Sequence, residues 1–184
     1  MLAVFVTRLI HGPRLCDVQL CAAPLVEGTL AEQAEQHMGM ASAAIFGAHG
    51  MLIDDEELHQ AMAARIEHQR VCAESALQDE LLAMVADYQA LDDEYLQVRE
   101  LDIRDILNRT LGHLTGLPPV PLSLNSKVLL LAEELLPSQM VGLDRQQIKG
   151  ICLSKGHILS HSAMLAEALD IPMMLNVIGC LEAK

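Results

Sequence analysis

The chain has 184 residues, of which 52% are hydrophobic, 20% are charged and 2% are aromatic. This length allows one domain or two small domains with a buried core, and the composition is typical of a soluble globular protein. The formal net charge of −13 argues against nucleic-acid binding, which needs clustered Lys and Arg, and it suits a basic protein partner. No apolar run reaches the roughly 18 residues of a membrane helix, so we expect no membrane insertion.

The number and spacing of the cysteines and glycines indicate the redox compartment and whether a cofactor is expected. There are five cysteines, an odd number, and none belongs to a Cys-x-x-Cys pair. We therefore expect reduced thiols in a cytoplasmic protein rather than disulfides or a zinc site. The glycines are too sparse to form a nucleotide-binding loop, and no nucleophile elbow is present, so we expect no cofactor.

The N-terminal half divides into a short strand-like part and a helical part. Residues 1–28 read as a strand, a loop and a second strand, because Gly and Pro residues interrupt them. Thr29 and Glu32 have the spacing of a capping box, which predicts a short helix that ends near Gly39. From residue 41 to about residue 116, apolar residues recur at helical spacing and predict a helical bundle.

The bundle contains one long predicted helix and ends at a clear break. The long helix is expected to continue through Tyr88, Leu91 and Tyr95, which keep the helical spacing. Gly116-Leu-Pro-Pro119 then interrupts the pattern. Beyond it we predict a strand at 128–131, a short helical turn at 146–148, a strand at 151–153, a helix near 161–169 and a strand at 173–177. Alternating strands and helices indicate a small α/β unit, so the predicted fold class is α+β, a helical bundle packed beside a small, incomplete α/β unit.

The helix of this α/β unit begins with a histidine. Ser160 is a good N-cap residue, which places His161 in the first helical turn, where free N–H groups and the helix dipole favour an anion. Gly156 lies in the turn that leads to this helix. A neutral imidazole at such a place can attack a phosphoryl donor and form a phosphohistidine. A histidine near a helix N-terminus is also common without any catalytic role.

Two other groups of polar residues suggest functions that compete with structural explanations. His157 and His161 are four residues apart, but the extended-looking residues between them argue against a helix through both, so we expect no metal site. An acidic corner follows the apolar pair Met51 and Leu52. Its members are Asp54, Asp55, Glu56 and Glu57. These residues predict a docking surface for a basic protein, although acidic residues also favour the first turn of any helix.

The segment around His161 resembles a known family. Gly156, Ser160-His161-Ser162-Ala163, Ala166 and Ile171-Pro172 are similar to the phosphohistidine segment of enzyme I of the phosphoenolpyruvate-dependent sugar phosphotransferase system. This chain has His157, Ile158 and Leu159 where the family usually has Gly, Arg and Thr. The resemblance implies that His161 carries the phosphoryl group, with Ser160 and Gly156 in the catalytic segment.

The resemblance extends over the helical part of the chain. Residues 44–58 are similar to the helix with which enzyme I binds its histidine-containing phosphocarrier protein, and residues 91–106 are similar to the next helical hairpin. It implies that the acidic corner with Met51 and Leu52 docks this carrier, and that Arg104 approaches the phosphohistidine. Arg104 is otherwise explained as a member of an exposed ion pair. His49 lies where the family also has a histidine, and we interpret it as structural.

At the level of individual residues, the sequence is most similar to the truncated enzyme I-like domain of the dihydroxyacetone kinase phosphotransferase branch. Residues 20–31 resemble the end of a mannose-type IIA domain, so the predicted domains are a strand-rich remnant at 1–30, a carrier-binding helical subdomain at 31–118 and a partial, swivelling phosphohistidine subdomain at 119–184. The barrel with which enzyme I binds phosphoenolpyruvate does not fit in this length.

Three functions remain open from the sequence. The first is a phosphoryl-transfer module that exchanges phosphate between His161 and a phosphotransferase-system carrier, toward dihydroxyacetone phosphorylation. The second is a truncated, inactive remnant that at most binds a carrier protein. The third is a helical adaptor, which leaves the strand-turn-helix unit around His161 unexplained. The apolar surface of the bundle is expected to be covered by a homodimer or by a missing domain.

Overall fold

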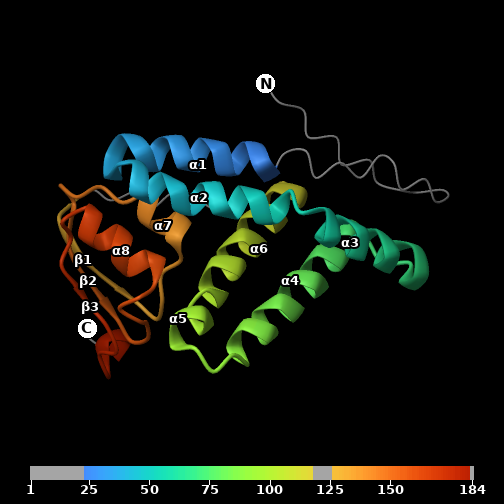
Figure 1. Ribbon diagram of the computed structural model, residues 1–184. Helices are drawn as coiled ribbons and strands as arrows, with labels where there is room; N and C mark the ends of the chain where they lie inside the picture. Colours follow the sequence, from blue (N-terminus) through green and yellow to red (C-terminus); the bar gives the residue numbers. More distant parts are fainter. Residues whose placement is uncertain (1–22, 118–125, 183–184) are drawn as a thin grey trace.

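A computed structural model of the chain describes residues 23–117 and 126–182. Its helices are α1 (Ala23–Met38), α2 (Met40–Ile53), α3 (Glu56–Gln69), α4 (Ala73–Gln89), α5 (Glu94–Gln97), α6 (Glu100–Leu114), α7 (Pro137–Val141) and α8 (His161–Ala168). Its strands are β1 (Val128–Ala132), β2 (Ile148–Leu153) and β3 (Met173–Met174), and a 3-10 helix spans Cys180–Glu182. Figure 1 shows α1 and α2 side by side, a group formed by α3, α4 and α6, and a small α/β unit with α7 and α8 beside the sheet.

The first described helix begins earlier than predicted. The expected strand-rich segment over residues 1–28 is wrong from residue 23 onward, because α1 starts at Ala23 and crosses the expected domain boundary at residue 30. Residues 1–22 of that segment lie outside the described residues. Pro24 is compatible with a first helical turn, where no N–H partner is needed, and Gly28 costs a helix only about 1 kcal/mol. The predicted end is confirmed at Gly39, whose φ of +85° suits glycine.

Aspartate caps explain where the helices of the bundle begin. Asp55 caps α3 by accepting hydrogen bonds from the N–H groups of Glu57 and Leu58, at 2.8 and 3.1 Å. Asp93 caps α5 in the same way. The predicted long helix through Tyr95 is therefore wrong: α4 ends at Gln89, and the chain turns before Asp93 begins a new helix. The next helix, α6, carries much of the site described below.

The sheet has three parallel strands in the order β1-β2-β3. The predicted strands are confirmed near their expected places, but β3 has only two residues, and residues 146–148 form no helix because Ile148 already begins β2. Helix α7, which starts at Pro137, was not predicted from the sequence. The Gln139 side chain accepts a hydrogen bond from the Leu136 N–H at 2.8 Å and caps this helix. Both α7 and α8 lie on the same face of the sheet (Figure 1).

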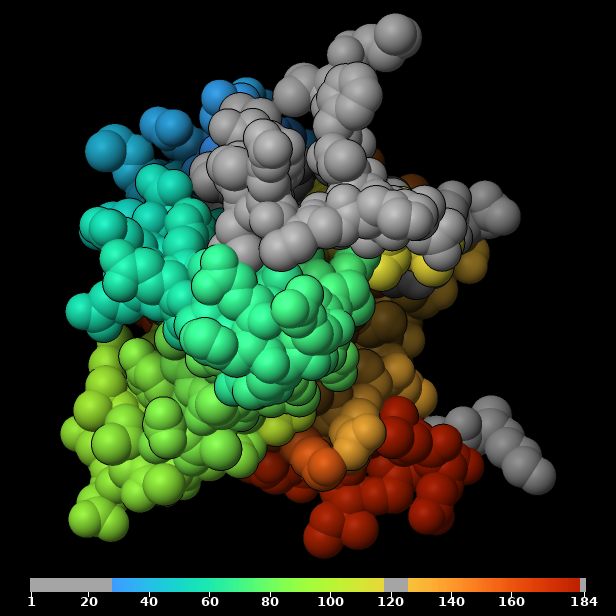
Figure 2. Space-filling view, turned by 90° about the vertical axis from the view of Figure 1, so that its right-hand side faces the viewer, coloured from blue at the N-terminus to red at the C-terminus, as the bar shows by residue number. Residues whose placement is uncertain are grey.

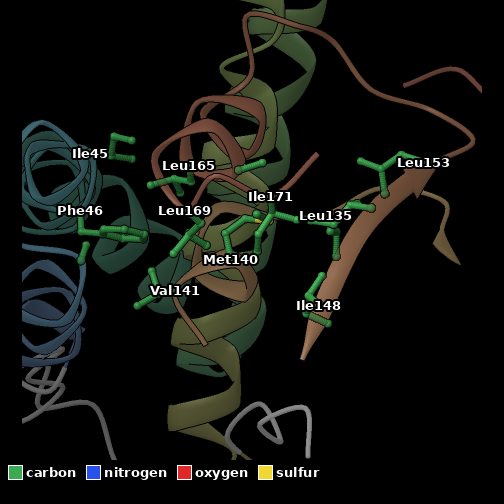
Figure 3. Close-up of a cluster of buried hydrophobic side chains, with 13 residues drawn as sticks. Ile45, Phe46, Leu135, Met140, Val141, Ile148, Leu153, Leu165, Leu169 and Ile171 are labelled. Carbon is green, nitrogen blue, oxygen red and sulfur yellow. The ribbon is translucent and has the colours of Figure 1, made fainter. Parts of the chain in front are cut away.

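Two apolar clusters stabilise the fold. One lies between α1, α2 and the α/β unit, and the other lies among α2, α3, α4 and α6. Helix α2 contributes to both, with Ile45 and Phe46 in the first cluster and Ile53 in the second. Figure 2 shows the side of the molecule formed by α3 and α4, and Figure 3 shows Phe46 near Val141 and Leu169 of the α/β unit. Among the described helices, none is long and apolar enough to cross a membrane.

A buried polar contact also joins the helical bundle to the α/β unit. The Asp105 carboxylate on α6 is 1% exposed and accepts hydrogen bonds from the Ser138 N–H at 2.9 Å and from the Ser138 hydroxyl at 2.5 Å. The Arg109 Nε lies 3.5 Å from the same carboxylate. Since a buried carboxylate is tolerated only with such partners, this contact fixes α7 against α6.

We expect Phe46→Ala to lower the free energy of unfolding by about 3–5 kcal/mol, because it removes a fully buried ring from the cluster that joins α2 to the α/β unit. Chemical denaturation followed by circular dichroism measures this change. Met40→Ala, on the same helix at 78% exposure, is the control and should change stability by no more than about 0.5 kcal/mol. Equal effects of the two substitutions would contradict the assigned core.

Candidate active site

The cap of α8 positions His161 as the sequence predicts. Ser160 is 4% exposed, and its hydroxyl accepts a hydrogen bond from the Ala163 N–H at 3.2 Å. The Ser160 carbonyl accepts from the Met164 N–H at 3.1 Å, so His161 is the first residue of the helix. The cap therefore sets the direction of the His161 side chain, which extends toward α6.

The loop before this cap requires glycine at one position. Gly156 has φ +139°, and an added Cβ would lie 3.0 Å from the Leu175 side chain. The next residue, His157, accepts a hydrogen bond from the Leu159 N–H at its Nδ1, at 3.1 Å, and its Nε2 lies 3.8 Å from the Glu94 carboxylate. Because α8 begins only at His161, no helix passes through both His157 and His161. The backbone of the loop that leads to Ser160 thus requires glycine at position 156.

The direct partner of His161 is a buried carboxylate. The Nδ1 atom of His161 lies 2.9 Å from Oδ1 of Asp102, which is in the first turn of α6 and 7% exposed. Burial raises the pKa of Asp102, but the hydrogen bonds and charge of His161 and His49 outweigh burial and lower that pKa to about 2. The carboxylate is therefore ionised at neutral pH.

The other oxygen of the Asp102 carboxylate forms an ion pair with an arginine. Arg99 Nη1 lies 3.3 Å from Asp102 Oδ2, and Arg99 Nη2 donates a hydrogen bond to the Leu159 carbonyl. The guanidinium also lies 4.9 Å from the centre of the Tyr95 ring. Arg99 thus connects α6 to the loop before His161 and brings a fixed positive charge to the site.

A second histidine faces Asp102 from α2. His49 is 4% exposed, its Nε2 lies 3.7 Å from Asp102 Oδ1, and its Nδ1 lies 3.1 Å from Nη2 of Arg109. The rings of His49 and His161 have their centres 6.5 Å apart. Sequence reasoning assigned His49 only a structural role, whereas the fold places it beside the carboxylate that holds His161.

The predicted docking residues cluster at the turn between α2 and α3. Met51 is 77% exposed, Leu52 is half-buried, and the four acidic residues that follow are exposed. Asp55 also serves as the cap of α3, and Glu56 and Glu57 lie in its first turn. Met51 is on the same helix as His49, two residues further along the chain, and the acidic corner follows directly after the end of α2 at Ile53. Helix α2 therefore connects the site to the expected docking surface.

Arg104 is placed differently from what the resemblance implies. Its Nε bonds to the Glu100 carboxylate one turn earlier on α6, and its side chain is 43% exposed. The arginine that contacts the carboxylate partner of His161 is Arg99. A helical signal could have revealed this, because Arg99 and Asp102 are three residues apart and such residues share a helix face.

Three of these side chains are close enough together to raise the question of a metal site. The ligand atoms of His49, Asp102 and His161 lie within 4.8 Å of one another, which is close enough to surround a metal ion. A guanidinium only donates hydrogen bonds, so Nδ1 of His49 must accept from Arg109. The proton of a neutral His49 is then on Nε2, which leaves that atom without a lone pair for a metal. The geometry favours a hydrogen-bonded group of side chains.

Comparisons with known proteins find matches over most of the chain. Two families match in succession, "PEP-utilising enzyme, N-terminal" over residues 18–99 and "PEP-utilising enzyme, mobile domain" over residues 124–184. The protein named "PEP-dependent dihydroxyacetone kinase, phosphoryl donor subunit DhaM" from Escherichia coli (strain K12) is 46% identical over 129 residues, 70% of this chain and 27% of that protein. "Phosphoenolpyruvate-protein phosphotransferase" from Geobacillus stearothermophilus is 38% identical over 146 residues, 79% of this chain and 25% of that protein.

A solved structure shows the same fold. The solution structure of an enzyme I protein matches with a TM-score of 0.67 and 30% identity, and the match covers 90% of this chain and 67% of that one. This confirms the α+β fold class of helical bundle and small α/β unit. The chain spans only 27% and 25% of the length of the two curated relatives. The chain belongs to the family of phosphoenolpyruvate-utilising enzymes, as a domain like the N-terminal domain of enzyme I.

Proposed function

We propose that this chain is a phosphoryl-transfer module that receives a phosphoryl group on His161 from a phosphohistidine of a carrier protein and returns it by the reverse reaction. The observation that carries the proposal is the 2.9 Å contact between His161 Nδ1 and Asp102. A histidine that donates its Nδ1 proton to a carboxylate keeps a lone pair on Nε2, which is the nucleophile that phosphoryl transfer needs. The similarity to phosphoryl donor subunits of dihydroxyacetone kinase supports a place in that branch of the phosphotransferase system.

The transfer step follows from this arrangement. The Nε2 lone pair of His161 attacks phosphorus as the N–P bond of the donor histidine breaks, and the electron pair of that bond returns to the donor ring. The proton of His161 stays on Nδ1, so the phosphorylated ring carries a positive charge, which the ionised Asp102 stabilises. The transferring phosphoryl group is stabilised by the charge of Arg99 and by the N-terminus of α8. No metal ion is needed for this step.

The partner of this reaction docks at the acidic corner. Exposed Met51 provides an apolar contact, and the carboxylates around it attract a basic surface. We assign this surface to a histidine-containing phosphocarrier protein of the phosphotransferase system. The short path along α2 from the corner to His49 supports docking that brings the carrier histidine toward His161.

A second function is favoured by one observation. The face of the sheet that α7 and α8 do not cover exposes Leu129 and Met174 at 69% and 63%, and β3 is only two residues long. Such an open sheet fits a remnant that binds a carrier at the acidic corner without transferring phosphate. The first experiment below separates this function from phosphoryl transfer.

Incubation with radiolabelled phosphoenolpyruvate, intact enzyme I and the phosphocarrier protein should label the chain on His161. The label should be stable in base and labile in acid, and His161→Ala should abolish it because no nucleophile is left. His113→Ala, in the last turn of α6, is the control and should be labelled like the wild type. A chain that is folded by circular dichroism, binds the carrier and remains unlabelled would leave only the binding function.

The double substitution of Asp54→Asn and Glu57→Gln should weaken carrier binding about fivefold at low salt, because it removes two exposed charges from the acidic corner. Calorimetric titration measures this loss, which should shrink above roughly 0.5 M salt, where exposed charges are screened. Glu32→Gln, an exposed change on α1, should leave the affinity unchanged. Equal weakening by the control would place the docking surface elsewhere.

A further inference from the structure

Four buried or half-buried side chains form one connected row through the site. Arg109 of α6 contacts His49 of α2, His49 faces Asp102 of α6, and Asp102 contacts His161 of α8. Arg109, His49 and Asp102 are 4%, 4% and 7% exposed. Donor groups alternate with acceptor groups along the row, so the donors of Arg109 at one end constrain which ring nitrogen of His161 carries the proton at the other end.

The direction of the row is fixed at Arg109. A guanidinium has five N–H donors and no acceptor, and it stays charged at every accessible pH. The 3.1 Å contact therefore requires Nδ1 of His49 to accept, which places the proton of a neutral His49 on Nε2. The Nε2 atom lies 3.7 Å from Oδ1 of Asp102, which is beyond hydrogen-bond distance but close enough for the N–H dipole to attract the carboxylate. His49 thus presents the positive end of its N–H dipole to Asp102.

The Asp102 carboxylate in turn determines which nitrogen of His161 carries the proton. An ionised carboxylate only accepts hydrogen bonds, so the 2.9 Å contact requires Nδ1 of His161 to donate. Arg99 occupies the second oxygen of the carboxylate at 3.3 Å and prevents it from rotating away. The tautomer of His161 that remains has its proton on Nδ1 and its lone pair on Nε2.

We propose that His49, held by Arg109, is a positioning residue that sets the reactive tautomer of His161 through Asp102. The inference rests on the proposed function and deepens it, because it names the residues that direct phosphorylation to Nε2 and away from Nδ1. His49 does not touch the reacting atoms and acts only through the carboxylate. In serine proteases, an Asp to Asn change behind the catalytic histidine gives the wrong tautomer and costs about 10⁴-fold in turnover.

Two substitutions at His49 separate positioning from mere packing. In His49→Gln the amide oxygen can accept from Arg109 and the amide N–H can donate to Asp102, so the row is preserved. In His49→Leu the row is broken although an apolar side chain still fills the space. Long-range proton–nitrogen correlation spectra of the full chain, with labelled histidine, report which nitrogen of His161 carries the proton.

We expect the wild type and His49→Gln to hold His161 almost entirely in the form protonated at Nδ1, and His49→Leu to give a mixture. Labelling of His161 through the phosphocarrier protein should slow about tenfold in His49→Leu and recover most of its rate in His49→Gln. A His49→Leu chain that is folded by circular dichroism, yet keeps the wild-type tautomer and rate, would overturn the inference. Stoichiometric binding of Zn²⁺ to the wild type, lost in His49→Leu, would also overturn it in favour of a metal site.

Failure of the proposed function gives a different result. If no variant is labelled but the His161 tautomer still depends on the residue at position 49, the positioning row is supported and phosphoryl transfer is excluded. If labelling occurs at the same rate in all three proteins, phosphoryl transfer stands and the role of His49 is wrong. The spectra and the labelling rates therefore test the two statements separately.

Discussion

The Asp102 carboxylate is the interaction on which the arrangement of the site depends. It contacts His161 of α8, faces His49 of α2 and contacts Arg99, which directly precedes α6, and it is almost completely buried. A buried charge is stable only when its partners replace water. The lowered pKa of Asp102, from 3.8 to about 2, corresponds to about 2 kcal/mol of stability, which is present above pH 4 and lost as the pH falls through 2.

One face of α6 carries the polar side chains that join the helical bundle to the α/β unit. Arg99, just before the helix, and Asp102, Asp105 and Arg109 follow one another at intervals of three or four residues, which places them on one helix face. Asp102 holds α8, and Asp105 holds α7 through Ser138. Because the two carboxylates are one turn apart, the α/β unit is fixed at two points. The position of His161 therefore depends on the contact between α6 and the α/β unit as well as on its own helix.

The sequence predicted the features that local signals encode, and it missed those that depend on tertiary contacts. Ser160 and His161 were found because an N-cap acts within three residues along the chain. The roles of Asp102 and His49 could not be found, because the partners of His161 are 59 residues away for Asp102 and on another helix for His49. A charged stripe on a helix usually faces water, so its burial was unexpected. The long helix through Tyr95 was wrong because the capping preference of Asp93 outweighed hydrophobic periodicity.

The loop before His161 differs in sequence from the usual loop of the enzyme I family. Where the enzyme I family usually has Gly, Arg and Thr, this chain has His157, Ile158 and Leu159, so the loop offers neither a guanidinium nor a hydroxyl. Arg99, the N-cap residue of α6, donates to the Leu159 carbonyl and reaches the Asp102 carboxylate, so a positive charge reaches the site from the start of α6. Arg99 is held on both sides, by the Asp102 carboxylate and by the Leu159 carbonyl, which limits the rotamers of its side chain. The altered loop is therefore compatible with phosphoryl transfer as long as α6 and α8 stay in contact.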